Sequence, residues 1–312
     1  MTSQLSTRRN KARRLGLRMR QCWELYLFLV PAVALVFIFN YVPMYGIQIA
    51  FKDFKPFLGI WDSKWVGLKH FVRLFKLPKF SLILSNTFTL SVMSIVLAFP
   101  FPIMLALMLN QLRNERYKRL IQTVTYLPHF ISTVIIVGML SVFLSTKYGI
   151  YRYFCDLLGA QPVNLMGKKS AFRWLYVFSG IWQHTGWNAI IYLAALSGID
   201  VGLYEAATID GANRWQRMMH IDVPSIVPTM IILLILDAGS FLSIGFEKIF
   251  LMQNSSNEMV SEVISTYTYK MGLVSMQYSF STAVNLLNTL VNFIMLFVVN
   301  MIARRVSDYS LW

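Results

Sequence analysis

An acidic side chain, Asp237, interrupts a long apolar run in the last third of the chain. Placing an Asp at the centre of a membrane helix costs about 2.5–3.5 kcal/mol on insertion scales, so this carboxyl group should face the protein interior or a water-filled path. Together with His184 it could form the acid–base pair of an intramembrane enzyme. Alone it could carry the proton of a secondary carrier, or line the path of a polar solute.

Polar and aromatic residues accompany this carboxyl group in two apolar runs. Ser240 and Phe241 should share a helix face with Asp237, because residues three and four apart are neighbours on a helix. In the run 174–196, a second stripe combines Ser179, Trp182, Gln183, Gly186 and Trp187. Aromatic planes stack on sugar rings, and amides or carboxylates bridge hydroxyl groups. The candidate substrate-pathway residues are therefore Trp182, Gln183, Trp187, Asp237, Ser240 and Phe241, unless these side chains only pack against neighbouring helices.

The motifs of the common catalytic and metal sites are absent from the sequence. It contains neither H-E-x-x-H nor G-x-S-x-G, and its two cysteines form no metal-binding cluster. It also lacks G-x-x-x-x-G-K-[ST], the loop that cradles nucleotide phosphates. We therefore expect no catalytic residue, no metal site and no nucleotide hydrolysis in this chain. If ATP drives its function, another polypeptide must bind the nucleotide.

Composition and apolar runs predict an all-α, polytopic membrane protein. Of its 312 residues, 56% are hydrophobic and only 14% are charged. A helix needs roughly 20 apolar residues to cross about 30 Å of hydrocarbon, and lipid-exposed backbone must satisfy its own hydrogen bonds. Six such runs predict six transmembrane helices at residues 25–45, 87–109, 123–144, 174–196, 226–246 and 283–302.

Basic residues suggest an orientation. They cluster before the first span (Arg8, Arg9, Lys11, Arg13, Arg14, Arg18 and Arg20), in the short connection 113–119, and at Arg304 and Arg305. Basic loops favour the cytoplasm, which places both termini there. The segment 47–86 would then be extracytoplasmic, although it is also basic. It could form a solvated or lipid-facing surface, or attract an acidic substrate or partner. Nucleic acid is not indicated, because the net charge of +15 is spread over loops without a binding motif.

The loop between the fourth and fifth runs is predicted to form two short helices. Asp200 can cap a helix that continues to Asp210, and Gly211 is a typical residue for its C-terminal end. A second short helix, 214–220, should lead to Pro224, which would begin the fifth span. Small residues would let another surface approach the first helix closely. That helix could fit a groove in a partner protein, or could lie idle at the membrane surface.

This loop resembles a known family motif. Glu205-Ala206-Ala207, three residues, Gly211, nine residues and Ile221-x-Val223-Pro224 are similar to the EAA loop of permease subunits in ATP-binding-cassette (ABC) importers. Only Val223 departs from the pattern, where the family has Leu. The resemblance implies a type I ABC importer permease fold. It also implies that this helix couples to a partner ATPase, which binds the ATP and Mg²⁺. The ATPase-coupling residues would be Glu205, Ala206, Ala207, Asp210, Gly211 and Pro224.

Further stretches resemble the polysaccharide/lipoprotein-type sugar permeases of the carbohydrate-uptake branch. They are Pro43-Met44-Tyr45-Gly46, Trp65-Val66-Gly67, Tyr126-Leu127-Pro128-His129-Phe130 and Ile191-Tyr192. This resemblance implies import of a carbohydrate, an oligosaccharide that in this branch is sometimes acidic. The implied partners are a second permease subunit in a heterodimer, a dimeric ABC ATPase, an extracytoplasmic solute-binding protein and membrane lipid.

The expected organisation follows from the spans and the loop. A basic cytoplasmic tail (1–24) precedes the first span and extracytoplasmic segment (25–86). The core permease domain (87–302) contains the EAA loop (200–224), and a cytoplasmic tail (303–312) ends the chain. We expect a multi-pass protein of the bacterial inner membrane.

Overall fold

The computed structural model describes residues 22–306 and 310, which form parts of two compact units, 1–69 and 70–312. The basic side chains expected from Arg8 to Arg20 lie outside the described residues. The described secondary structure is helical apart from one sheet of two short strands. Each unit is described by itself.

The first unit consists of a long helical segment followed by a small sheet. Helix α2 (Trp23–Val36) continues through the π-helical turn η1 (Phe37–Tyr41) and the 3₁₀ segment η2 (Val42–Phe51). No residue of α2 is buried within the chain, as expected where lipid surrounds a span. Strand β1 (Lys52–Lys55) pairs antiparallel with β2 (Ser63–Trp65), and α3 (Gly59–Asp62) lies between them in sequence. The span expected at 25–45 is confirmed, and it extends at both ends.

The second unit contains the remaining elements. Its first half comprises α4 (Lys69–Phe75), α5 (Phe80–Ala98), α6 (Pro100–Asn110), α7 (Glu115–Tyr126), η3 (Leu127–Phe130), α8 (Thr133–Phe143), α9 (Ile150–Leu157) and α10 (Lys169–Ser197). The second half comprises α11 (Val201–Ile209), α12 (Arg214–Arg217), η4 (Met218–Asp222), α13 (Val223–Gly239), α14 (Phe246–Met252), α15 (Glu258–Ser261), α16 (Ile264–Tyr269), η5 (Lys270–Val274) and α17 (Tyr278–Val306).

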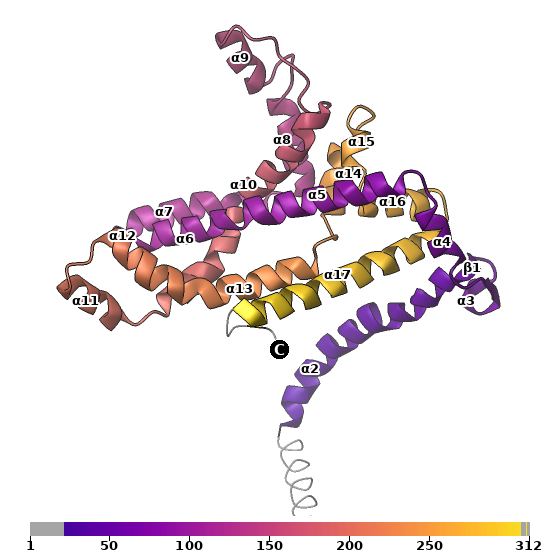
Figure 1. The fold of residues 1–312 in the computed structure, drawn as a ribbon, viewed down its shortest axis with the longest axis horizontal. Helices are drawn as coiled ribbons and strands as arrows, with labels where there is room; N and C mark the ends of the chain where they lie inside the picture. The colour runs from indigo at the N-terminus through magenta and orange to yellow at the C-terminus, as the bar shows by residue number, and fades with distance from the viewer. Residues whose placement is uncertain (1–21, 307–309, 311–312) are drawn as a thin grey trace, which may run out of the picture. The chain divides into compact units, whose positions relative to one another are not determined.

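Long helices form the frame of this unit. Figure 1 shows α5 and α6 as one continuous rod, with α13 and α17 along a similar direction. Three apolar clusters hold the frame together. Leu74, Ile83, Tyr267 and Phe280 join α4, α5, α16 and α17 at one end. Phe172, Ile249 and Met252 lie in a middle cluster with α5, and Ala106, Ala189 and Ile226 join α6, α10 and α13 toward α11.

The number of spans depends on two bent helices. Among the described residues, four helices are long and apolar enough to cross a membrane, and six if each bent pair is one span. The unbroken helices are Trp23–Phe51, Phe80–Asn110, Arg214–Gly239 and Tyr278–Arg305. The run expected at 87–109 therefore begins earlier, at Phe80. Residues 303–306, expected in the C-terminal tail, belong to α17.

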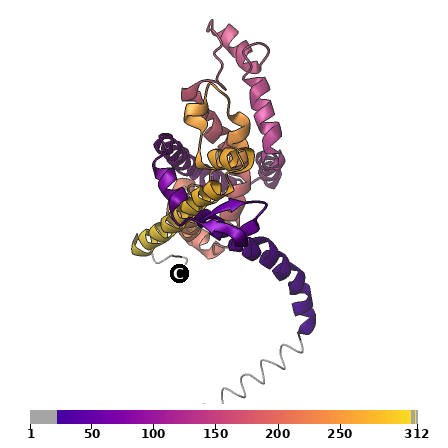
Figure 2. The same ribbon diagram turned by 90° about the vertical axis from the view of Figure 1, so that its right-hand side faces the viewer.

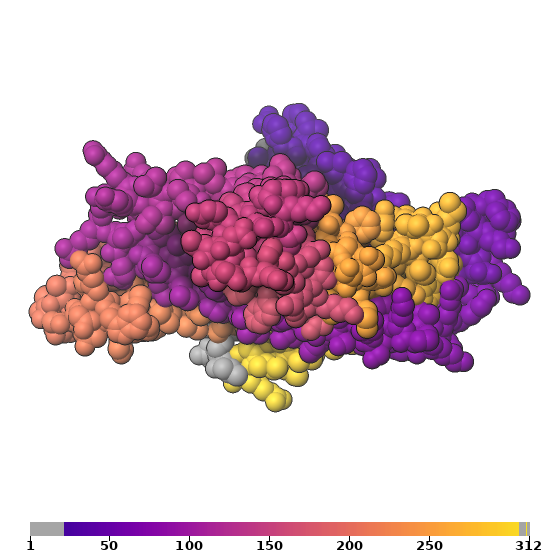
Figure 3. All heavy atoms as spheres, turned by 90° about the horizontal axis from the view of Figure 1, so that it is seen from above, coloured from indigo at the N-terminus to yellow at the C-terminus, as the bar shows by residue number. Residues whose placement is uncertain are grey.

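The run 123–144, predicted as one span, is broken into two helices by a sharp bend. Its first part ends at Phe130 and its second part begins at Thr133, with a bend of 99° between them. Ile131 is extended, and the hydroxyl oxygen of Ser132 caps α8 by accepting a hydrogen bond from the Ile135 N–H group. Helix α8 and the following α9 consequently stand out from the rest of this unit, as Figures 1 and 2 show, and face the viewer in Figure 3.

The fifth run also differs from expectation at both ends. The helix begins at Arg214 and passes through Pro224, so that residues 214–220 are not a separate short helix. A π-helical turn, η4, lies directly before Pro224, where the missing N–H group of proline disturbs α-helical bonding. The helix ends at Gly239 rather than at 246. Ser240 and Phe241 therefore do not continue the helix of Asp237, and the expectation of one shared helix face is wrong.

Candidate coupling surface and substrate cavity

Helix α11 has well-defined ends, as the sequence predicts. The Asp200 carboxylate accepts a hydrogen bond from the Gly202 N–H group at 2.9 Å, which caps the first turn. At the other end Gly211 has a positive φ of 77°, and the Ala212 N–H group donates to the Ala207 carbonyl at 2.9 Å. These features form a Schellman motif, which needs a residue such as glycine in the left-handed region.

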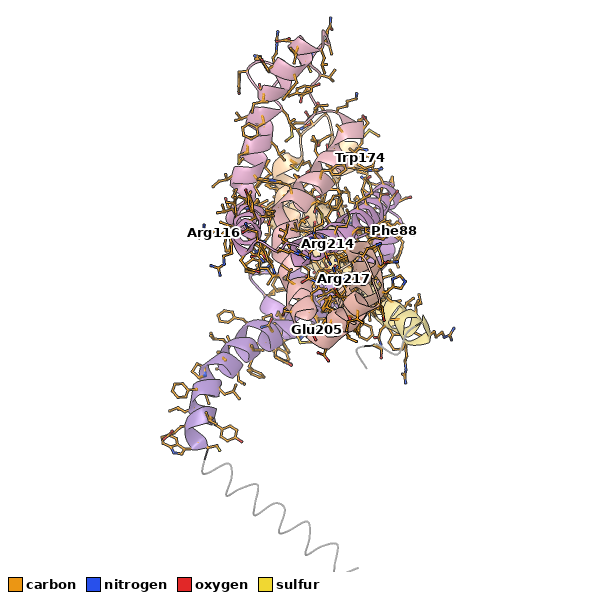
Figure 4. The ribbon with its side chains drawn as sticks, turned by 90° about the vertical axis from the view of Figure 1, so that its left-hand side faces the viewer. Phe88, Arg116, Trp174, Glu205, Arg214 and Arg217 are labelled. Atoms are coloured by element: carbon orange, nitrogen blue, oxygen red, sulfur yellow. The ribbon has the colours of Figure 1, made fainter. Side chains whose placement is uncertain are left out.

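The surface of α11 is open along its whole length. None of its residues is buried, and the apolar side chains of Leu203 and Ile209 are 52% and 86% exposed. Glu205, Ala206 and Asp210 are exposed, and so is Pro224. Ala207, Asp210 and Gly211 line a shallow hollow of about 280 Å³ together with Arg217 and His220. Figure 4 looks onto this end of the unit, where Glu205, Arg214 and Arg217 lie.

The side of α11 that faces the rest of the unit is hydrogen-bonded to residues of η4 and α12. The Tyr204 hydroxyl group donates to the carboxylate of Asp222, which also accepts a hydrogen bond from Gln111 Nε2 at 2.8 Å. Arg217 Nη1 donates to the Thr208 hydroxyl at 3.2 Å. Sequence reasoning missed Asp222 and the inward hydrogen bond that Tyr204 makes to it. A carboxylate two positions before Pro224, between apolar residues, was the available signal.

A cavity of about 350 Å³ lies midway along the rod formed by α5 and α6. Its walls come from the α5–α6 junction, the middle of α10, the end of α13 and the segment 240–245. Asp237, Ser240 and Phe241 all line it, so the structure brings these three predicted residues together. Asp237 is exposed at the cavity wall, which agrees with a water-filled path rather than a lipid-facing carboxyl group.

The cavity exists because α13 stops inside the unit. Residues 240–245 are not helical, and such backbone is tolerated at membrane depth only where protein buries it or a water-filled cavity adjoins it. Asn292 on α17 supports this segment, because its Oδ1 accepts from the Leu242 N–H group and its Nδ2 donates to the Ser243 hydroxyl, each at 2.8 Å. Broken helices of this kind commonly form solute sites in transporters.

The other predicted pathway residues lie elsewhere on α10. Gln183 lines a neighbouring chamber and donates to the Ile131 carbonyl at 3.1 Å, across the bend that precedes α8. Trp187 stacks on the His129 ring with 4.4 Å between centroids. Trp182 lines a third, almost wholly apolar groove beside Trp174. The structure does not place either tryptophan in the wall of the Asp237 cavity.

Several lining residues escaped sequence reasoning. Tyr176, Asn188 and Tyr192 come from α10, and Lys248 comes from α14. Asn188 and His184 are four residues apart in an apolar helix, which is a signal that could have been used. Lys248 follows the end of an apolar run, so its burial could not be read from the sequence. Together with Asp237, these groups provide hydroxyl, amide, carboxylate and ammonium partners for a polyhydroxylated solute.

Comparison with known proteins decides the family. Residues 98–308, about two thirds of the chain, match the family described as the binding-protein-dependent transport system inner membrane component. The chain belongs to this permease family. It is therefore a multi-pass inner-membrane permease. Membership of this family supports neither of the other two functions considered for Asp237, those of an intramembrane enzyme and of a proton-coupled carrier.

Relatives of this permease match over nearly its full length. It is 41% identical to the polygalacturonan/rhamnogalacturonan transport system permease protein YteP of Bacillus subtilis (strain 168), covering 98% of this chain and 95% of that protein. It is 43% identical to protein LplB of the same organism, with 94% and 92% covered. Both relatives agree with the resemblance to sugar permeases of the carbohydrate-uptake branch that the sequence motifs indicated.

Solved structures share the fold. A chain of a bacterial alginate ABC transporter, crystallised with an alginate pentasaccharide-bound periplasmic protein, superposes with a TM-score of 0.86 at 38% identity. That match covers 96% of this permease and 100% of the other chain. A second structure, of a transporter involved in import of the acidic polysaccharide alginate, gives a TM-score of 0.86 at 39% identity. The expected type I ABC importer permease fold is confirmed.

Proposed function

We propose that this permease imports an acidic oligosaccharide as one subunit of an ATP-driven, binding-protein-dependent transporter. The observation that carries the proposal is the nearly full-length similarity to proteins named for polygalacturonan/rhamnogalacturonan and for alginate, whose sugar units carry carboxylates. The polar cavity at Asp237 supports it, because its hydroxyl, amide and aromatic groups suit sugar rings. The end of α13 and the segment 240–245 form part of the wall of that cavity.

A second permease subunit covers the open side of this cavity. Asp237, His184 and Asn188 are all exposed within this chain, yet they lie on spans or broken spans. Lipid cannot satisfy such groups, so they must face another protein or water held by it. A different partner chain supplies the other half of the pathway, and an extracytoplasmic solute-binding protein delivers the sugar to it.

Helix α11 transmits the work of a dimeric ABC ATPase, which binds the ATP and Mg²⁺. Its exposed apolar residues and small residues fit a groove in that partner. Glu205 and Asp210 lie on the exposed surface that would dock, whereas Tyr204 reaches inward. The basic connection at 113–119 and α11 lie on one side, since Gln111 contacts Asp222. That side is cytoplasmic in this proposal, and both termini share it.

Uptake into proteoliposomes tests the proposal. The complex is purified with its partner subunits and reconstituted with its binding protein, and uptake of labelled trigalacturonate is measured. We expect uptake to require ATP on the ATPase side and to survive a proton uncoupler. Uptake without ATP, or its collapse with the uncoupler, would contradict an ATP-driven importer.

Charge reversal on α11 tests the coupling role. Glu205→Lys should abolish uptake while the ATPase still hydrolyses ATP, because the docking contact no longer fits. Glu115→Lys is the matched control, since Glu115 is an exposed acid at the start of α7. Normal uptake by Glu205→Lys would show that α11 does not couple the two reactions.

A further inference from the structure

A second chamber, of about 400 Å³, adjoins the Asp237 cavity. We call it the Lys248 chamber and define it by Gln183, His184, Asn188, Glu247 and Lys248. Tyr176 and Asn188 line both spaces, so the two lie side by side. A solute held beside Asp237 therefore lies next to the Lys248 chamber, with the polar side chains of Tyr176 and Asn188 between them.

Lys248 is a buried cation with few partners. The residue is 9% exposed, and its Nζ donates to the Tyr176 carbonyl at 3.2 Å and lies 5.3 Å from the centre of the Tyr176 ring. An ammonium group has three donors, and the carbonyl takes one of them. Over the described part of the chain, no carboxylate forms a salt bridge with this ammonium group.

The charges around Lys248 leave a place for an anion. His184 lines the same chamber from α10, and its Nδ1 atom lies 3.2 Å from Nδ1 of His129 on η3. Glu247 lies next to it on α14, but its side chain is exposed, and Asp237 lines the adjoining cavity. A buried charge without a counter-ion is costly, so a site that keeps one is suited to an anionic ligand.

The protonation state permits this role. Burial lowers the pKa of Lys248 from its usual value to about 8. The ammonium form still predominates at neutral pH, and its charge is lost as the pH rises through that value. Desolvation strengthens attraction for a carboxylate, because few water molecules compete for it.

We propose that Lys248 binds a carboxylate of the acidic oligosaccharide during its passage, with Asn188 and the wall of α10 facing the sugar hydroxyl groups. This inference rests on the proposed function and assigns the acidic specificity to one residue. The site takes a uronate unit rather than a neutral hexose.

Substitution of Lys248 tests the inference in the reconstituted complex. Lys248→Gln and Lys248→Met should lower trigalacturonate uptake about 10- to 100-fold, the range expected for a lost hydrogen bond to a charged group. Stimulation of the ATPase by the loaded binding protein should persist, which shows that the variant folds and docks. Lys147→Gln, which changes an exposed lysine, is the matched control and should leave uptake unchanged.

The pH profile provides a second readout that a structural role would not move. Wild-type uptake should fall above about pH 8 as Lys248 loses its proton. Lys248→Arg should restore uptake at neutral pH and should keep it at higher pH, because a guanidinium group stays charged. An identical pH profile for the wild type and Lys248→Arg would overturn the inference.

The two proposals fail in different ways. If the wild-type complex takes up no trigalacturonate, the acidic substrate class is wrong. If the wild type transports it and both Lys248→Gln and Lys248→Met match the wild-type rate, the permease function stands and Lys248 is not its carboxylate site. If Lys248→Gln and Lys248→Met fail to assemble while Lys248→Arg transports with the wild-type pH profile, the residue is structural and the inference is overturned.

Discussion

The hydroxyl group of Tyr204 on α11 donates a hydrogen bond to the carboxylate of Asp222, and Asp222 itself is completely buried. The same carboxylate accepts a hydrogen bond from Gln111 at the end of α6. One acidic group therefore joins the exposed helix to the ends of two long helices, α6 and the helix that contains α13. Movement of α11 must displace both helices or break this contact.

Removing the Tyr204 hydroxyl group should weaken that connection. Tyr204→Phe leaves Asp222 with one fewer partner, and a buried acceptor without its donor costs about 1–3 kcal/mol. We expect lower thermal stability of the purified complex and fewer sugars imported per ATP hydrolysed. Tyr117→Phe, on the exposed surface of α7, is the control. An unchanged ratio of uptake to hydrolysis would show that this hydrogen bond does not transmit force.

Gly211 should not tolerate a side chain with a Cβ atom. Its φ of 77° lies in the left-handed region, where an ordinary L-residue is disfavoured by about 1–2 kcal/mol. Gly211→Ala should loosen the end of α11 and reduce coupled uptake, and Gly211→Asn should be milder because Asn accepts this conformation. Gly198→Ala is the matched control, since Gly198 has a negative φ of −87°. Equal uptake by Gly211→Ala and Gly198→Ala would show that coupled uptake does not require glycine at position 211.

Gly186 allows α10 to pass close to α7. A Cβ atom at this position would overlap the carbonyl group of Thr125, which is backbone and cannot simply move aside. Gly186→Ala should therefore destabilise the complex by about 1–3 kcal/mol, as overpacking does. Thermal unfolding measures the effect, with Gly138→Ala on α8 as the control because nothing lies within 4 Å there. Equal melting temperatures for the two variants would refute this close packing.

Asn292 should matter more than Asn288, one turn earlier on α17. Asn292→Ala removes two hydrogen bonds and leaves the Leu242 N–H group buried without its partner, at a cost of about 1–3 kcal/mol. Asn288 is the control because its buried Oδ1 has no hydrogen-bond partner among the described residues. We expect Asn292→Ala to lower both the melting temperature and the uptake rate. The reverse order of effects would show that the segment 240–245 is held in another way.

Much of the candidate site could be read from local sequence. Asp200 and Gly211 set the ends of α11 through bonds within a few residues, so their types and spacing were sufficient. The position of Asp237 next to a polar space also followed, because an unpaired carboxyl group deep in lipid is costly. The role of Asn292 in bonding to another segment agrees with the general behaviour of amides in membrane helices.

Other features depended on contacts between distant residues. Pro128 lies close to the break before α8, yet the bend of 99° is at the extended Ile131, whose carbonyl accepts a hydrogen bond from Gln183 on α10. Trp182 and Gln183 are adjacent in sequence, but in the packed structure Trp182 lines an apolar groove and Gln183 lines the Lys248 chamber. Neither outcome is encoded in spacing along one helix.

By itself the sequence determined the membrane class, the approximate spans, the ends of α11 and the permease motif. These follow from hydrophobic length and short-range hydrogen bonding, which act within about 20 consecutive residues. Only the tertiary structure decided where α13 stops, which polar groups share a cavity, and that Lys248 is buried with no salt-bridge partner among the described residues. Those results come from helices that are far apart in the chain and meet in space, where each satisfies the polar groups of another.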